Sequence, residues 1–248
     1  MIKLLKYDLR RNATLLLGVT AVLILCELVL LWSRAALDVK IGFSVIFFIG
    51  AVVIFAINNL RVFDYNIHSI SRRLLPVRTL SYVWASLIYG VMNTFVLVLI
   101  GAGTALYFGN HIDTFALREV LHLPAYAWTE IVLELIFTLI YGFLAFYVII
   151  ALARSITRKG VFWVGLLLFL VLSNVIGWIE NLLFHQDSDP FFSLVTFHVE
   201  IKNGVVEHGP VSANTSWNTL GAFMFEALLC VVFLFVIKWC VEKKIEAR

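Results

Sequence analysis

Among the ionisable side chains within the long apolar runs of this sequence are Glu27, Glu134 and Glu226. An ionisable side chain inside a bilayer is costly, and it usually faces a cavity or a neighbouring helix. Counted from the expected outer end of each run, all three lie about seven to ten residues deep, or roughly 10 to 15 Å, so they can share one layer. Because no lysine or arginine lies inside the runs, burial favours the protonated form of each carboxyl group.

Two interpretations of these carboxyl groups stay open. They can form an acidic layer in a translocation path that favours cationic or hydrogen-bond-donating substrates. Alternatively, they can be neutral packing residues that bond to nearby backbone or to a second subunit. Replacement of each by glutamine would separate the two interpretations, because only the first predicts a loss of transport.

Other reactive groups do not form a recognisable catalytic constellation. The sequence contains no G-x-x-x-x-G-K-[ST] phosphate loop, no H-E-x-x-H and no G-x-S-x-G. Ser44, Ser86 and Ser173 are interpreted as helix-packing residues, and the irregular spacing of His185, His198 and His208 argues against a metal site. We therefore expect no catalytic residue, no metal and no cofactor bound by this chain, and no enzymatic activity of its own.

The elements that position these residues are membrane spans. The chain has 248 residues, of which 62% are hydrophobic and 14% are charged, well below the roughly 25% charged residues of soluble domains. Apolar runs of about 20 residues are long enough to cross a bilayer core of roughly 30 Å. Six such runs predict an all-α polytopic fold in one domain over residues 1–248, with spans at 13–33, 41–60, 81–108, 127–153, 161–184 and 217–237.

The distribution of basic residues predicts the orientation. With the N-terminus inside, fifteen lysines and arginines fall in inner segments, and only Arg34, Lys40, Arg118 and Lys202 fall in outer ones. The positive-inside rule then places both termini in the cytoplasm of a multi-pass cell-membrane protein. A cleaved signal peptide over residues 1–35 is the rival, but its apolar run is too long and contains a glutamate. No nucleic-acid partner is expected, because the positive charge is not concentrated on a soluble face.

Two segments outside the spans have patterns of their own. In "MIKLLKYDLRRN", Ile2, Leu5 and Leu9 share one helical face, which predicts an N-terminal helix lying on the inner leaflet; an ordinary basic flank is the alternative. In the outer segment 185–216, "VTFHVEI" alternates with period two, Asn203-Gly204 can form a tight turn and "VVEH" can pair back. This pattern predicts a small extracellular β-hairpin between spans five and six.

The segment between spans two and three, "RVFDYNIHSISRRLLPVRTL", interrupts the apolar sequence with basic residues. Ile67, Ile70 and Leu74 recur at helical spacing, so a short amphipathic helix can form with Arg72 and Arg73 off its apolar face. Pro76 would end that helix, because proline lacks an amide donor and restricts the residue before it. A basic amphipathic helix at this place suits docking to a cytoplasmic partner or to anionic lipid.

This arrangement resembles the membrane subunit of ABC transporters of the type 2 exporter class. Proteins of that family have a cytoplasmic helix between spans two and three that ends in an element like Leu75-Pro76-Val77 of this chain. They also have a cytoplasmic interfacial N-terminal helix, six spans, both ends inside, and a structured outer segment between spans five and six. The resemblance covers the whole chain.

The resemblance implies a permease subunit that couples ATP hydrolysis in a separate ATPase subunit to export. Its residues for coupling to the ATPase would be Asp64, Ile67, Ile70, Arg72, Arg73, Leu74, Leu75 and Pro76. The partners would be two ATPase subunits that bind ATP-Mg, a second permease copy or a homologous permease, and membrane lipid, in the bacterial cytoplasmic membrane. The alternatives are a non-transporting assembly or sensor module, in which the arginines only set topology or bind lipid, and an ion-coupled secondary transporter.

Overall fold

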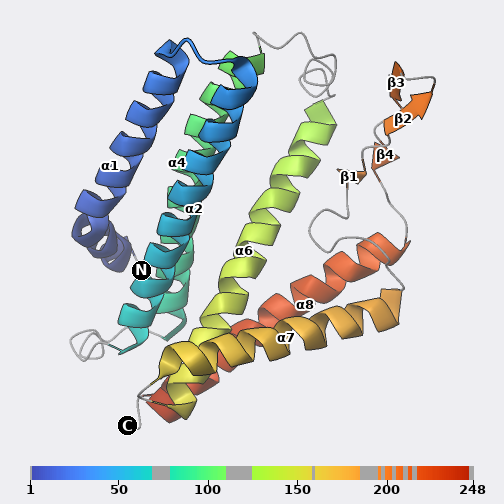
Figure 1. The fold of residues 1–248 in the computed structure, drawn as a ribbon. Helices are drawn as coiled ribbons and strands as arrows, with labels where there is room; N and C mark the ends of the chain where they lie inside the picture. The colour runs from blue at the N-terminus through green and yellow to red at the C-terminus, as the bar shows by residue number, and fades with distance from the viewer. Residues whose placement is uncertain are drawn as a thin grey trace. The chain divides into compact units, whose positions relative to one another are not determined.

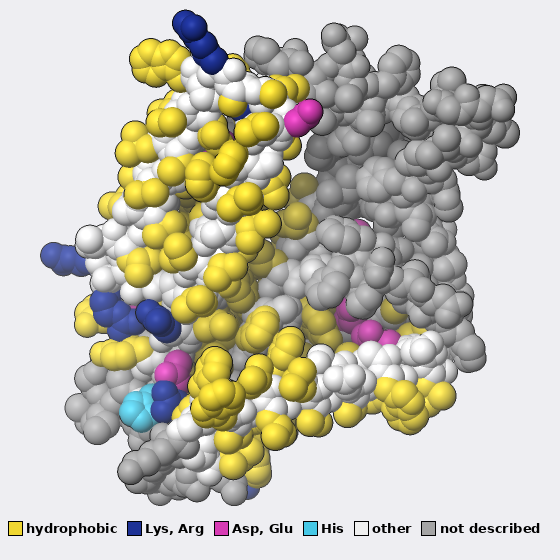
Figure 2. Space-filling view, viewed as in Figure 1, with side chains coloured by type: hydrophobic (Ala, Val, Ile, Leu, Met, Phe, Trp, Pro, Cys, Tyr) yellow, Lys and Arg dark blue, Asp and Glu magenta, His cyan; other side chains and the backbone are white. Residues whose placement is uncertain are grey.

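The structure is a computed structural model, and it describes residues 2–68, 79–109, 125–157, 160–184 and 217–245 together with four short strands. Within these residues, six helices are long and apolar enough to cross a membrane, which confirms the prediction of a multi-pass, six-span helical protein. Hydrophobic side chains cover most of the described surface that Figure 2 shows. Such a surface is suited to lipid rather than to water.

The chain divides into two compact units, Met1–His122 and Leu123–Arg248. Unit 1 contains α1 (Ile2–Trp32), α2 (Leu37–His68) and α4 (Thr79–Gly109). Unit 2 contains α6 (Ala125–Ile156), α7 (Val161–Phe184), α8 (Trp217–Cys240) and a π-helical turn, η1 (Val241–Ile245) (Figure 1). All four prolines fall outside these helices, as expected for a residue that lacks an amide donor. The single domain over 1–248 stays a prediction.

In unit 1, each of the three helices packs against the other two. Leu23 of α1, Ala51 and Phe55 of α2 and Leu97 of α4 form a buried apolar cluster between them. The link from α1 to α2 is short, and Lys40 Nζ donates to the carbonyl oxygen of Leu31 at 3.3 Å. A cation at the C-terminus of a helix compensates unpaired carbonyl groups and the helix dipole.

In unit 2, α6 packs against both α7 and α8, and aromatic rings take part in both contacts. Tyr141 stacks on Phe233 of α8 with ring centroids 6.0 Å apart, and Phe146 stacks on Phe169 of α7 at 5.6 Å. Gly160, between α6 and α7, has φ +78°, a conformation that glycine adopts without a steric penalty. No residue of α7 is buried, so this helix offers most of its apolar surface to its surroundings.

Short strands lie between α7 and α8. β2 (Val199–Lys202) pairs antiparallel with β3 (Val205–His208), with Val199 opposite His208 and Lys202 opposite Val205. β1 (Val195–Thr196) pairs with β4 (Ser212–Ala213) in a second antiparallel ladder. These pairings fall on the segment where the period-two pattern led us to expect a hairpin.

The N-terminal residues belong to the first long helix. α1 runs without a break from Ile2 to Trp32, and Figure 1 shows its first turns inclined to the rest. That these turns lie on the inner leaflet stays a prediction. Leu4 and Asp8 in these turns are buried within unit 1, and Leu5 and Leu9 of the predicted apolar face are partly exposed. Contacts with α2 and α4, which no local pattern reveals, select the buried face.

Candidate functional site

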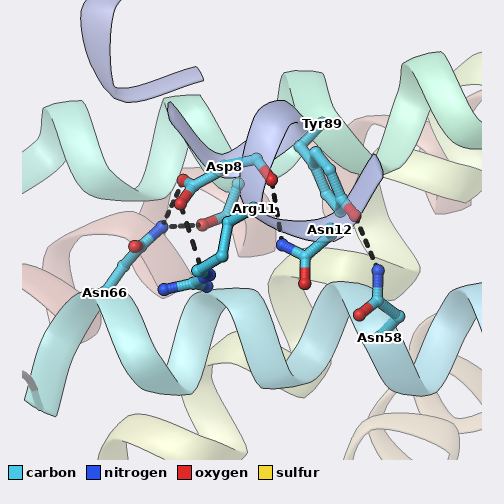
Figure 3. A network of polar contacts seen from close by, with 7 residues as sticks. Asp8, Arg11, Asn12, Asn58, Asn66 and Tyr89 are labelled. Carbon is cyan, nitrogen blue, oxygen red and sulfur yellow. Dashed lines mark hydrogen bonds and ion pairs between the residues drawn. The ribbon is translucent and has the colours of Figure 1, made fainter. Parts of the chain in front are cut away.

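A buried polar cluster joins the three helices of unit 1 at the end where α1 begins. Asp8 of α1 is fully buried, at 0% exposure. Asn66 Nδ2, in the last turn of α2, donates to Asp8 Oδ2 at 3.1 Å and also lies 3.1 Å from Ser86 Oγ of α4. Figure 3 shows Asp8 and Asn66 pointing toward each other across the gap between their helices. One amide group therefore bridges α1 and α4.

Arg11 adds a positive charge to this cluster. Its Nη2 atom lies 3.9 Å from Asp8 Oδ1, and its guanidinium carbon lies 3.9 Å from the centroid of the Tyr65 ring. A guanidinium over an aromatic face is attracted by the ring quadrupole. Asn12 Nδ2 donates to the carbonyl oxygen of Asp8 at 2.9 Å, within α1 itself. Asp8 and Arg11 thus both hold the first turns of α1 against the end of α2.

An apolar group lies next to the polar cluster and also joins α1 to α4. Leu4 of α1 forms a buried group with Tyr82 and Ala85 in the first turns of α4. Leu4 is 5% exposed and Ala85 is fully buried. Ser86 follows Ala85 directly on α4. The polar and the apolar contacts therefore both join the start of α1 to the start of α4.

A seam of polar side chains continues between α2 and α4 toward the middle of these helices. Asn58 Nδ2 donates to the Tyr89 hydroxyl at 2.6 Å (Figure 3). Tyr89 also hydrogen-bonds to Asn93. Asn58, Asn59, Tyr89 and Asn93 are all buried. Interhelical hydrogen bonds in membranes are worth about 0.6 kcal/mol on average and up to roughly 1.7 kcal/mol. The seam therefore fixes the register of α2 against α4.

Only two of the residues proposed for coupling lie within the described part of the chain. Asp64 and Ile67 belong to the last turns of α2, which continues past the predicted span end at residue 60 to His68. Ile67 is 3% exposed, so it packs inside unit 1 and does not contribute to an open apolar face. Ile70, Arg72, Arg73, Leu74, Leu75 and Pro76 lie outside the described residues.

Glu27 lies at the opposite end of unit 1. The Ser44 hydroxyl of α2 donates to its carboxyl group and lies 2.9 Å from both Oε1 and Oε2. Glu27 is 3% exposed. This bond favours the packing interpretation for Glu27, with a side chain and not the backbone as the partner. Ser44 and Ser86 are more than small packing residues, since each hydrogen-bonds to another helix, whereas Ser173 bonds within α7.

An apolar cavity of about 490 Å³ lies beside Ser44 between α2 and α4. Phe48 and Val52 of α2 face Gly101, Thr104 and Phe108 of α4 across it. Thr104 donates its hydroxyl to the carbonyl of Gly101, so it offers no free donor to the cavity. No charged side chain lines the cavity, and its chemistry suits hydrocarbon.

Unit 2 carries Glu134 on α6, Glu180 on α7 and Glu226 on α8. Both Glu134 and Glu180 lie close enough to Glu226 for their carboxyl groups to interact electrostatically. Tyr141 is within the same range of Glu180 and Glu226. All three carboxyl groups are partly buried. Because Glu27 belongs to the other unit, a layer shared by Glu27, Glu134 and Glu226 stays a prediction.

Several of these residues escaped the sequence analysis. Glu180 lies inside the fifth predicted span, so its intramembrane position was a visible signal. Asn59 and Asn66 are seven residues apart, as are Ser86 and Asn93, which is the spacing of one helical face. Asp8 gave no such signal, because an acidic residue among basic ones reads as a solvated face. Among the described residues, no group of acidic, histidine or cysteine side chains is suited to hold a metal ion.

The fold and these sites define a multi-pass membrane protein with polar contacts inside its helical units. Comparison with known proteins adds no family: no family model, no curated protein and no solved structure matches the chain.

Proposed function

We propose that this chain is the transmembrane permease subunit of an ATP-driven exporter of the type 2 ABC class. ATP hydrolysis would take place in a separate ATPase subunit, and a second permease copy or a homologous permease would complete the pathway. One observation carries the proposal: α2 continues as an unbroken helix from the membrane span to His68, immediately before the basic segment that contains Leu75-Pro76-Val77.

α2 is long enough to transmit a displacement mechanically. A helix of 32 residues extends about 48 Å at 1.5 Å per residue, so α2 exceeds a bilayer core of roughly 30 Å. A displacement of the segment after His68 would therefore be transmitted along α2 into the span. In the proposal, nucleotide-driven closure of the ATPase moves this segment, with Arg72 and Arg73 as its contacts, and the spans respond by alternating access.

The orientation belongs to the same proposal. Both termini and the basic segment face the cytoplasm, because fifteen of the nineteen lysines and arginines then lie inside. The paired strands β1 to β4 consequently lie on the outer side as an extracellular cap. The membrane is proposed to be the bacterial cytoplasmic membrane, as in the family that the chain resembles.

Glu134 and Glu226 are the proposed translocation-path residues, now with Glu180. Their proximity supports this role, because grouped carboxyl groups from three helices attract cationic or hydrogen-bond-donating groups more strongly than isolated ones. Of the three glutamates first considered for the translocation path, Glu27 has the least support for that role. Ser44 already satisfies its carboxyl group in the interior of unit 1.

Co-purification tests the proposal. The tagged chain is isolated from its native membrane in mild detergent, co-eluting proteins are identified, and ATP hydrolysis is measured. We expect an ATPase to co-purify with the parent and to be lost from the Arg72→Glu/Arg73→Glu variant. Lys6→Glu/Arg10→Glu is the matched control, since it reverses two exposed charges on the same proposed side. Absence of any ATPase under several mild conditions would overturn the proposal in favour of an assembly or sensor module.

A second function, ion-coupled transport, is favoured by the same group of Glu134, Glu180 and Glu226. Intramembrane carboxyl groups serve as proton relays in pumps and secondary transporters. Transport measured in sealed vesicles separates the two functions. ATP is supplied, and an ionophore is added to collapse the ion gradients. ATP-driven export that survives collapse of the ion gradients supports the ABC proposal, whereas export that needs the gradient and no nucleotide supports the ion-coupled one.

A further inference from the structure

The residues that hold the first turns of α1 flank one connection in the chain. Asn66 lies in the last turn of α2, shortly before the segment 69–78, and Tyr82, Ala85 and Ser86 lie in the first two turns of α4, shortly after it. α1 contacts both groups, through Asp8 on one side and Leu4 on the other. Both ends of the connection are therefore tied to a third helix.

We infer that Asp8 is a latch that holds the first turns of α1, the end of α2 and the start of α4 together as one body. The latch is defined as Asp8, Asn66 and Ser86. Its existence is independent of the proposed function. Its consequence rests on that function: movement of the segment 69–78 by an ATPase would reach α1 as well as α2 and α4, and Asp8 would be the positioning residue for that transmission.

The burial of Asp8 makes it the critical member. A carboxylate at 0% exposure must be satisfied by the protein, and two of its partners here are Asn66 and Arg11. Without the carboxylate, Asn66 Nδ2 keeps only Ser86, and the guanidinium of Arg11 loses its anion. Asn66 would then lose its hydrogen bond to α1, and Arg11 over the Tyr65 ring would remain as a contact between α1 and α2.

The hydrogen bonds of the latch leave one polar atom of Asn66 unsatisfied. Asn66 is 2% exposed, and its Oδ1 atom has no hydrogen-bond partner among the described residues. Asn66 shares one amide nitrogen between Asp8 and Ser86, each at 3.1 Å. Buried polar atoms without a partner are rare and costly.

Thiol labelling of position 4 tests the latch. Leu4→Cys is placed in a full-length background in which Cys26, Cys230 and Cys240 are alanine, and its reaction with a maleimide is timed in mild detergent. Leu4 is 5% exposed, so we expect slow labelling in the parent. Asp8→Ala should raise the rate by about fivefold or more, because labelling follows the population of the open state. Asp8→Asn and Ser86→Ala should raise it less.

Two controls make the result decisive. Asn12→Ala removes a side-chain bond within α1 and should leave the rate unchanged. Leu23→Cys reports on the separate apolar cluster of unit 1 and should stay protected in every variant. Equal labelling of parent and Asp8→Ala would overturn the latch. An equal rise at positions 4 and 23 would also overturn it, because Asp8 would then support the whole unit.

A second arm tests transmission in the complex with the co-purified ATPase. ATP-Mg should change the labelling rate at position 4 in the parent, whereas Asp8→Asn should remove this response without releasing the ATPase. A nucleotide response that survives in Asp8→Asn would overturn the role in transmission. Failure to recover any ATPase would contradict the proposed function but leave the first arm to decide the latch.

Discussion

The hydroxyl of Ser44 lies 2.9 Å from both carboxyl oxygens of Glu27, so the glutamate of α1 is tied to the first turns of α2. This pairing makes Glu27 part of the packing of unit 1.

The Glu27–Ser44 pair predicts a difference between two substitutions. Ser44→Ala leaves a buried carboxyl group without its donor and should lower the free energy of unfolding by about 1 to 2 kcal/mol. Glu27→Gln keeps an acceptor for Ser44 and should cost less than about 1 kcal/mol. Thermal unfolding of both variants in detergent measures the difference. Loss of transport in Glu27→Gln at unchanged stability would return Glu27 to the translocation path.

For the three glutamates of unit 2, we expect replacement by glutamine to impair transport. Glu134→Gln, Glu180→Gln and Glu226→Gln should each reduce ATP-driven export of a fluorescent cationic amphiphile by severalfold, because an acidic path attracts cations. Glu27→Gln is the matched control and should export at the parental rate. The assay uses vesicles that contain equal amounts of each protein. Unchanged export in all three variants would assign them to packing.

The polar seam predicts a measurable coupling between α2 and α4. Tyr89→Phe removes the acceptor of Asn58 and should lower the free energy of unfolding by about 1 kcal/mol. The double variant Asn58→Leu/Tyr89→Phe should lose less than the sum of the single variants, because both remove the same bond. Ser173→Ala, which removes a bond within the exposed face of α7, is the control. Strict additivity would show that the 2.6 Å contact contributes nothing.

The proposed orientation predicts opposite access at the two ends of α2. In a background without the three native cysteines, Asp38→Cys should react with an impermeant maleimide added to intact cells, and His68→Cys should react only after the cells are opened. Both positions are exposed, so burial does not decide the result. The reverse pattern would place the basic segment outside and contradict the positive-inside assignment.

The apolar runs predicted the spans well because a run of about 20 apolar residues without proline has few other stable structures in a membrane. Helix ends were harder to predict. α2 extends to His68 because Val62, Phe63 and Ile67 are buried against neighbouring helices, although Arg61 and Asp64 suggested the membrane boundary. Asp8 was invisible to pattern analysis for a similar reason. Its partners, Asn66 and Ser86, are distant in sequence, and only the packed unit brings them to its carboxylate.

The position of Asp8 has a consequence for biogenesis. Asn66 is 58 residues further along the chain, so at roughly 5 to 20 residues per second it is synthesised about 3 to 12 s after Asp8. During that interval the carboxylate has no interhelical partner and is better placed in water or among lipid headgroups than in the bilayer core. The first turns of α1 would therefore reach their final place only after α2 and the start of α4 have been inserted, so that the earliest part of the chain is among the last to be fixed.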